Sequence, residues 1–371
     1  MMQKTLFLII CFFVWSPFAY NQTWNQLTTI DPKPSARCGH TAVYDNNNHK
    51  MIVFGGNLWG PGMTNDVWVL SNDTMYPTWA QLTVTGDIPV GRWTHSAVYD
   101  DVNNRMIIFG GYDSYNYYND VYVLTNANGL TGTPTWIKLT PTGAAPSKRV
   151  GHNAVYDSTN NRMIIFGGNI NEITYFNDVW ILSNANGLGG TPSWSQLSTD
   201  NGIPDKRYAH SGCYDSINNK MIIFGGRYGN DSYKNDTWIL SNANGLNGIG
   251  YWSQISTIGN IPATRWYHNT VYDPTTNRMI LFGGGYLVGT IFYNDNWILT
   301  NPNGLDGNTS WIQTNPNGVL PTSRAFSSSV FDSDKNCLVV FGGFYNDGTE
   351  HVLNDVWILD NANPVSSWYL Y

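Results

Sequence analysis

Six arginines recur at intervals of roughly 57 residues, and each stands three residues before a histidine, except in the last copy, which has Ser327. An arginine can bind a carboxylate through two parallel hydrogen bonds, and a ring of imidazoles can bind a metal ion. The missing sixth histidine argues against a metal, and we expect none. Because every copy repeats the arginine, a structural role, in which the arginine donates hydrogen bonds to loop carbonyls, is at least as good an alternative as ligand binding. The arginines are Arg37, Arg92, Arg149, Arg207, Arg265 and Arg324, and the histidines are His40, His95, His152, His210 and His268.

The sequence contains only two glutamates, Glu172 and Glu350, and His351 follows the second. A general acid and a general base could be built from these residues if the fold brought them together. No Ser-His-Asp order, phosphate-binding loop or metal-spaced cluster accompanies them. Glu172, Glu350 and His351 are therefore weak catalytic candidates. The sequence favours a binding protein over an enzyme and leaves the question open.

Each copy places the same run of short apolar segments between these residues. In the second copy we predict strands at 96–99, 105–109, 121–124 and 135–139. The second strand is apolar throughout, as in a strand buried on both faces, and the fourth alternates like an outer strand. One four-stranded sheet cannot cover both of its own faces. The six copies must therefore stack around an axis, as the blades of a β-propeller do.

Several further residues recur in the same order in all six copies: Phe-Gly-Gly after the second strand, Asn-Asp before the third, and a later Trp. This pattern resembles the kelch repeat in a long, bacterial-style spacing, as in the central domain of galactose oxidase. The resemblance implies an all-β fold, a six-bladed kelch-type β-propeller of four-stranded antiparallel blades over residues 21–371. It also implies that the six arginines can meet acidic ligands at the mouth of the central channel. Some kelch propellers are enzymes, but we match no catalytic residue of theirs to this chain, and a shared fold does not confer chemistry.

Seven segments resemble an outer strand with a tryptophan, although there are only six sets of inner strands. The segment at Trp24 matches the repeated Trp-x-Gln-Leu better than the segment at Trp368 does. We therefore predict that the N-terminal strand completes the last blade, which would protect the sheet edges.

The direction of the strands alternates within a blade, so the loops fall on two faces. We call the face with the loops after Gly-Gly and before each arginine the loop face, and the opposite face, with its uniform Asn-rich turns, the turn face. On the loop face, the positions after the arginines vary and are often aromatic, as are the insertions after Gly-Gly. Such residues can bind sugar rings or a protein partner, or merely fill the space between loops. The predicted ligand-binding residues are Arg37, Arg92, Trp93, Arg149, Arg207, Tyr208, Arg265, Trp266 and Arg324.

Residues 1–20 have the features of a secretory signal peptide. Lys4 precedes an apolar run at 6–14 that is too short to cross a bilayer, and small residues follow at a possible cleavage site. We expect a secreted, cell-surface or periplasmic protein with no membrane insertion once the signal is removed. Cys38, Cys213 and Cys337 occupy unmatched places in their copies, which predicts buried thiols and no disulfide framework.

The net charge of −7 and the lack of a basic cluster argue against nucleic acid as a partner. We expect no cofactor and a monomer. The sequence as a whole predicts a binding module that recognises a glycan or a protein partner through the arginine and aromatic residues of the loop face. The alternative is a carbohydrate-modifying enzyme, similar to the sialic-acid epimerase of the kelch family, that uses the same face.

Overall fold

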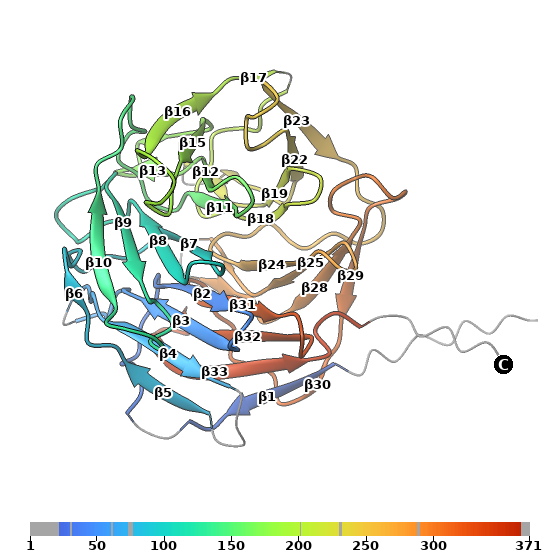
Figure 1. The fold of residues 1–371 in the computed structure, drawn as a ribbon. Helices are drawn as coiled ribbons and strands as arrows, with labels where there is room; N and C mark the ends of the chain where they lie inside the picture. The colour runs from blue at the N-terminus through green and yellow to red at the C-terminus, as the bar shows by residue number, and fades with distance from the viewer. Residues whose placement is uncertain are drawn as a thin grey trace, which may run out of the picture.

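The computed structural model describes residues 22–29, 32–60, 62–72, 77–200, 202–229, 232–287 and 290–364. These residues form strands and turns, and no helix of membrane-spanning length and hydrophobicity occurs within them. Six four-stranded antiparallel sheets stand around one axis (Figure 1). The predicted all-β, six-bladed propeller is therefore confirmed. The predicted signal peptide and Trp368 lie outside the described residues.

The strands of each blade follow one another from the axis outward. Blade 1 contains β2 (Thr41–Asp45), β3 (Lys50–Phe54), β4 (Val67–Ser71) and β5 (Thr78–Gln81), and blade 2 contains β7 (Ser96–Asp100), β8 (Arg105–Phe109), β9 (Val121–Thr125) and β10 (Thr135–Leu139). Blade 3 contains β11 (Asn153–Asp157), β12 (Arg162–Phe166), β15 (Val179–Ser183) and β16 (Ser193–Leu197), and blade 4 contains β18 (Ser211–Asp215), β19 (Lys220–Phe224), β22 (Thr237–Ser241) and β23 (Gly250–Ile255). Blade 5 contains β24 (Asn269–Asp273), β25 (Arg278–Phe282), β28 (Asn296–Thr300) and β29 (Ser310–Thr314), and blade 6 contains β31 (Ser328–Asp332), β32 (Cys337–Asn346), β33 (Glu350–Asp360) and β1 (Thr23–Leu27).

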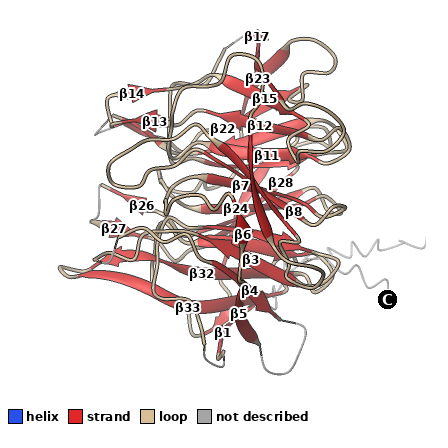
Figure 2. Cartoon of the chain, turned by 60° about the vertical axis from the view of Figure 1, so that its left-hand side comes forward, coloured by secondary structure: helices blue, strands red, loops and turns tan. Residues whose placement is uncertain are grey.

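Short additional strands extend this frame at the rim and on the loop face. The rim strands β6 (Thr85–Gly86), β17 (Thr199–Asp200) and β30 (Asn317–Gly318) pair in parallel with the outer strand of the next blade. The insertions form hairpins from β13 (Asn169–Ile170) and β14 (Thr174–Tyr175), β20 (Arg227–Tyr228) and β21 (Ser232–Tyr233), and β26 (Gly285–Tyr286) and β27 (Ile291–Phe292). Figure 2 shows β13–β14, β26–β27 and the tip of the β32–β33 hairpin projecting on the same side of the disc.

The hydrophobic core lies in the seams, which are the junctions between neighbouring blades. The phenylalanine of each Phe-Gly-Gly packs against the outer-strand tryptophan of the next blade, as Phe54 does on Trp136 with ring centroids 4.9 Å apart. All six seams repeat this contact, including Phe282 on Trp24. The repeated aromatic residues therefore bury the faces that one blade cannot cover alone.

The two ends of the described chain meet in blade 6. The N-terminal strand β1 pairs antiparallel with β33, with Trp24 opposite Leu359, and Gln22 Nε2 donates a hydrogen bond of 2.8 Å to the carbonyl of Ala362. In Figure 1 the blue β1 lies beside the red β33. The prediction that the Trp24 segment completes the last blade is confirmed.

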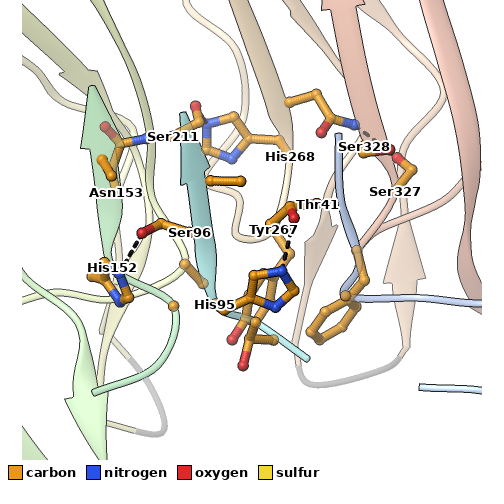
Figure 3. Close-up of a pocket in the computed structure, with 18 of the residues that line it drawn as sticks. Thr41, His95, Ser96, His152, Asn153, Ser211, Tyr267, His268, Ser327 and Ser328 are labelled. Atoms are coloured by element: carbon orange, nitrogen blue, oxygen red, sulfur yellow. Dashed lines mark hydrogen bonds between the residues drawn. The ribbon is translucent and has the colours of Figure 1, made fainter. Parts of the chain in front are cut away.

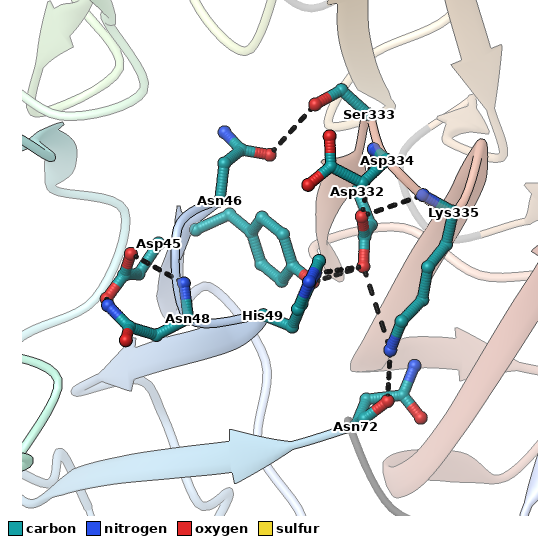
Figure 4. A network of polar contacts seen from close by, with 10 residues as sticks. Asp45, Asn46, Asn48, His49, Asn72, Asp332, Ser333, Asp334 and Lys335 are labelled. Carbon is teal, nitrogen blue, oxygen red and sulfur yellow. Dashed lines mark hydrogen bonds and ion pairs between the residues drawn. The ribbon is translucent and has the colours of Figure 1, made fainter.

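Buried polar bonds join the blades on the turn face. In five seams an asparagine that follows the third strand of a blade donates to the aspartate that ends the neighbouring inner strand; Asn244, for example, donates to Asp157 over 2.7 Å. In the seam between blades 6 and 1, Tyr44 donates to Asp332 over 2.6 Å and His49 Nδ1 lies 3.1 Å from the same carboxylate (Figure 4). Among the described residues, His49 thus contacts the aspartate of this seam, as the asparagines do in the other five.

The glycine doublets have a steric cause. Gly110 has φ +69°, and a Cβ added there would lie 2.8 Å from the carbonyl oxygen of Arg149 in the next blade. Only glycine combines this backbone conformation with so close an approach. Cys38, Cys213 and Cys337 are buried and free, as predicted, and burial raises the pKa of Cys38 to about 12.

Candidate functional site

All six repeated arginines are fully buried, with 0% of each exposed. In blade 4, Arg207 donates to both carboxylate oxygens of Asp236 over 2.6 and 2.8 Å and to the carbonyl of Gly225 over 3.0 Å. The same arrangement recurs in every blade, and the partners of Arg37, Arg92, Arg149, Arg265 and Arg324 are Asp66, Asp120, Asp178, Asp295 and Asp355. The geometry supports the structural role, because the donors are occupied inside the blade. Direct contact between these arginines and a ligand remains a prediction.

The aspartates of the Asn-Asp pairs are therefore the arginines' partners. Burial opposes ionisation of Asp236, but the hydrogen bonds and charge of Arg207 outweigh it, and its pKa is lowered. The preceding Asn235 donates to the backbone carbonyl of Pro262 in the next blade over 3.2 Å, as the other five asparagines do in their seams. These asparagine bonds cross the seams between blades, and the ion pairs of the aspartates were not predicted from the sequence.

The five histidines lie at the loop-face end of the inner strands and are also buried. Each packs edge-on against the phenylalanine of the preceding blade, as His152 does on Phe109 at 5.2 Å. Burial, and then the charge of the neighbouring arginine, lowers the pKa of His40 and of His210 to about 3. These imidazoles are neutral at pH 7. In the described part of the chain, no group of three or more His, Cys, Asp or Glu could hold a metal ion.

A closed ring of backbone hydrogen bonds frames the mouth of the central channel on the loop face. The second residue after each arginine has a positive φ, and its N–H donates to the carbonyl of its counterpart in the preceding blade over 2.7 to 3.1 Å. Six such bonds run once around the axis. The ring residues are Gly39, Thr94, Gly151, Ala209, Tyr267 and Phe326.

Large side chains cover part of this mouth, and we call Trp93, Tyr208, Trp266, Tyr267 and Phe326 the aromatic cap. Tyr267 stacks on Phe326 with centroids 3.9 Å apart, and Phe326 also contacts Trp93 and Trp266 at 5.8 and 5.2 Å. The Tyr267 hydroxyl reaches blade 3, since it lies 3.0 Å from where a Cβ would stand on Gly151. The structure thus brings together the predicted Trp93, Tyr208 and Trp266. Tyr208 and Trp266 are themselves buried, so most of their surface contacts other side chains of the protein.

A seventh buried arginine, Arg227, breaks the symmetry beside the cap. Its guanidinium lies 4.8 Å from the ring centroid of Trp266 and 5.0 Å from that of Tyr208, and only 2% of the residue is exposed. Its ionic partner is the exposed Glu172, at 3.8 Å. Arg227 was not among the predicted site residues, although it directly follows Gly-Gly, where the other copies have Asn57, Tyr112, Asn169, Gly285 and Phe344.

The weak catalytic candidates have separate partners in separate loops. Glu350 accepts a hydrogen bond of 2.6 Å from Trp59 Nε1, whereas Glu172 pairs with Arg227. His351 lies 3.1 Å from Asp347 and stacks on Tyr345. No contact joins Glu172 to Glu350 or His351 among the described interactions, and the geometry adds nothing to the enzyme alternative.

Many insertion aromatics fill space between loops, which was one of the alternatives left open. Tyr118, Phe176 and Tyr293 lie over three of the repeated arginines at 4.3 to 4.4 Å. Tyr112 stacks on Tyr117, and Trp59 stacks on Phe344. A smaller set remains exposed at the tips of the insertions: Trp59, Tyr115, Ile173, Tyr228, Leu287 and Ile291.

The inner strands enclose an axial cavity of about 260 Å³ below the ring. Its wall consists of the ring residues, the histidines and the two residues that follow them, and no Asp, Glu, Lys or Arg lines it. Figure 3 shows Asn153 and the hydrogen-bonded pairs His95–Thr41 and His152–Ser96 in this wall. The site therefore offers two environments, an uncharged polar channel and an apolar loop face above it.

The sequence profile of the KLHDC2/KLHL20/DRC7 Kelch-repeats domain matches residues 13–129, 59–184, 129–240 and 190–369. The Drosophila melanogaster protein Host cell factor is 28% identical over 275 residues, which are 70% of this chain and 17% of that protein. Mouse Kelch domain-containing protein 1 is 29% identical over 298 residues, or 71% of this chain and 66% of the mouse protein. The solved structure of YjhT superposes with a TM-score of 0.62 over 87% of this chain and 95% of that one, at 15% sequence identity, which shows a shared fold.

Proposed function

Because the chain belongs to the KLHDC2/KLHL20/DRC7 Kelch-repeats family, whose propellers typically serve as protein-interaction modules, we propose that it binds a protein partner on its loop face. We also propose that it acts outside the cytoplasm, on the strength of the signal-like residues 1–20. This chain spans only 17% of Drosophila Host cell factor and 66% of mouse Kelch domain-containing protein 1. The activities of those whole proteins are therefore not assigned to it.

One observation carries the choice of surface: only the loop face has insertions that differ from blade to blade. The insertions of blades 1 to 5 each expose at least one large apolar side chain, and the most exposed are Tyr115 at 89% and Ile173 at 78%. Spread over five blades, these side chains form contact points for a partner of protein size. A sugar would need a free aromatic face close to polar groups, and the aromatic cap buries most of its own faces. A protein is therefore favoured over a glycan.

The turn face provides a matched control. Val102 and Ile217 are as exposed there, at 81% and 78%, as Tyr115 and Ile173 are on the loop face. We would compare the wild type with Tyr115→Ser/Ile173→Ser and with Val102→Ser/Ile217→Ser, using cross-linking capture from the medium and surface of cells that express the chain.

The expected result is a protein that the wild type and the turn-face variant retain and the loop-face variant captures at least 10-fold less. Equal capture by the two double variants would reject the loop face as the docking surface. A glycan array run with the same three proteins separates the ligand classes, because glycan binding that depends on Tyr115 and Ile173, without any captured protein, would replace the protein partner by a sugar.

A further inference from the structure

A belt of hydrogen bonds crosses the seams inside the channel, and one of its six links is missing. The residue after each histidine binds the histidine, or Ser327, of the next blade, as Ser96 binds His152 Nε2 over 2.7 Å. Five seams have this link: Thr41–His95, Ser96–His152, Ser211–His268, Asn269–Ser327 and Ser328–His40. In the seam between blades 3 and 4, Asn153 and His210 share no such bond.

The polar atoms at the missing link are buried and without a partner. His210 Nε2 and Asn153 Oδ1 make no hydrogen bond, and the Asn153 amide instead reaches the carbonyl of Gly212 over 3.4 Å. The Nδ1 atom lacks a partner in all five histidines, so it is Nε2 that distinguishes His210. His210 is 6% exposed and lines the axial cavity together with Asn153. An unmade hydrogen bond at a buried polar group is costly, which gives a ligand at this place a favourable partner.

The other seams indicate what chemistry would complete the link. In four of them the group that meets the imidazole Nε2 is a Ser or Thr hydroxyl. Two more hydroxyls in the cavity wall, Thr270 Oγ1 and Ser329 Oγ, are also buried without partners. They occupy positions that are alanine or glycine in the other blades, namely Ala42, Ala97, Ala154 and Gly212. The cavity wall therefore offers unused hydrogen-bonding groups on blades 3, 4, 5 and 6.

We propose that the axial cavity binds a small uncharged polyol, one hydroxyl of which takes the place of the missing Ser or Thr hydroxyl between Asn153 and His210. A hydroxyl can both donate and accept, so it suits Asn153 Oδ1 and either tautomer of His210. The wall carries no charged side chain to balance an ionic ligand. A volume of about 260 Å³ accommodates a molecule the size of several waters. This site is separate from the loop-face docking surface and stands without it.

The sharpest variant is Asn153→Ser, which installs the residue that three other blades already carry at this position. It is expected to restore the sixth link and to fold normally. Thr41→Ser is the matched control, because it makes a similarly small change at a link that stays intact. The probes are glycerol, erythritol, xylitol, myo-inositol and glucose, with gluconate and glucosamine as charged counterparts.

Binding would be measured by titration calorimetry and by the imidazole resonances of histidine-labelled full-length protein. For at least one neutral polyol we expect saturable binding that shifts the His210 resonance in the wild type and Thr41→Ser, and a loss of at least 10-fold in affinity in Asn153→Ser. Low millimolar concentrations are needed, because polyols stabilise any protein by exclusion at high concentration. Equal binding by Asn153→Ser, preference for the charged probes, or no saturable binding at all would each overturn the proposal.

Discussion

The loop face and the turn face join the same six blades with different chemistry. On the loop face, buried arginine–aspartate pairs brace each blade from within, and asparagines reach the backbone of the next blade. On the turn face, neutral asparagine amides bind aspartates across the seams. Only the loop face carries insertions that differ from blade to blade. The residues that define the repeat therefore hold the fold together, and recognition is to be sought where the copies differ.

The largest expected effect is a loss of folding stability at low pH that starts on the loop face. The five buried histidines lie there, at the loop-face ends of the inner strands. Their pKa values are lowered in the folded state, to about 3 for His40 and His210, mainly by burial. Below an unfolded pKa of about 6.5 the unfolded chain binds protons that the folded chain does not, so stability is complete above that pH and falls as the pH decreases toward 3. Each histidine contributes up to roughly 1.4 kcal/mol per pH unit.

Denaturant unfolding at pH 7, 6 and 5 would measure this loss. The lowered carboxylate pKa values of Asp66, Asp178, Asp236 and Asp355 matter only below a pH of about 4, so the interval from pH 7 to 5 isolates the histidines. Hydrogen exchange should show the inner strands losing protection first at their loop-face ends. A flat stability profile over this interval would contradict neutral, buried imidazoles.

The next largest effect is that of one loop-face ion pair. Arg207→Met leaves the carboxylate of Asp236 with the indole of Trp238 and without its charge partner, and should lower the free energy of unfolding by about 3 kcal/mol. Denaturant unfolding measures the change. Lys206→Met, at the exposed neighbouring position, serves as control and should stay within about 0.5 kcal/mol of the wild type. If both variants behave alike, the pair does not brace the blade.

The smallest of the three effects concerns one turn-face link. Asn244→Ala removes the hydrogen bond to Asp157 across the seam, but Asp157 keeps its bond from Asn160, so we expect a loss of about 2 kcal/mol. Thermal and denaturant unfolding would be compared with Asn247→Ala, an exposed asparagine of the same loop. A larger loss for Asn244→Ala than for Arg207→Met would reverse the ranking of the two faces.

Periodicity predicted the blades, the order of the strands, the closing strand and the buried cysteines, because all of these follow from burial repeated along the chain. The ion pairs were missed for a physical reason. Arg207 and Asp236 are separated by two strands and an insertion, and the equivalent separation varies from 28 to 31 residues between blades. The aromatic cap depends on positive-φ backbone at Tyr267 and Phe326 and on bonds between distant blades, which no local pattern reports.

Blade 6 contains both the first and the last strand of the described chain, so it cannot be completed until these two strands meet. Asn25 of β1 binds Asp360 at a separation of 335 residues, which makes the final sheet one of the least local pairings that this chain can form. Before the pairing is made, the other blades can form an open arc in which the free edge of β33 presents unsatisfied backbone groups. Such non-local closure is slow and exposes the arc to aggregation in the meantime. We therefore expect the joining of β1 to β33 to be the step that turns an arc of blades into a ring.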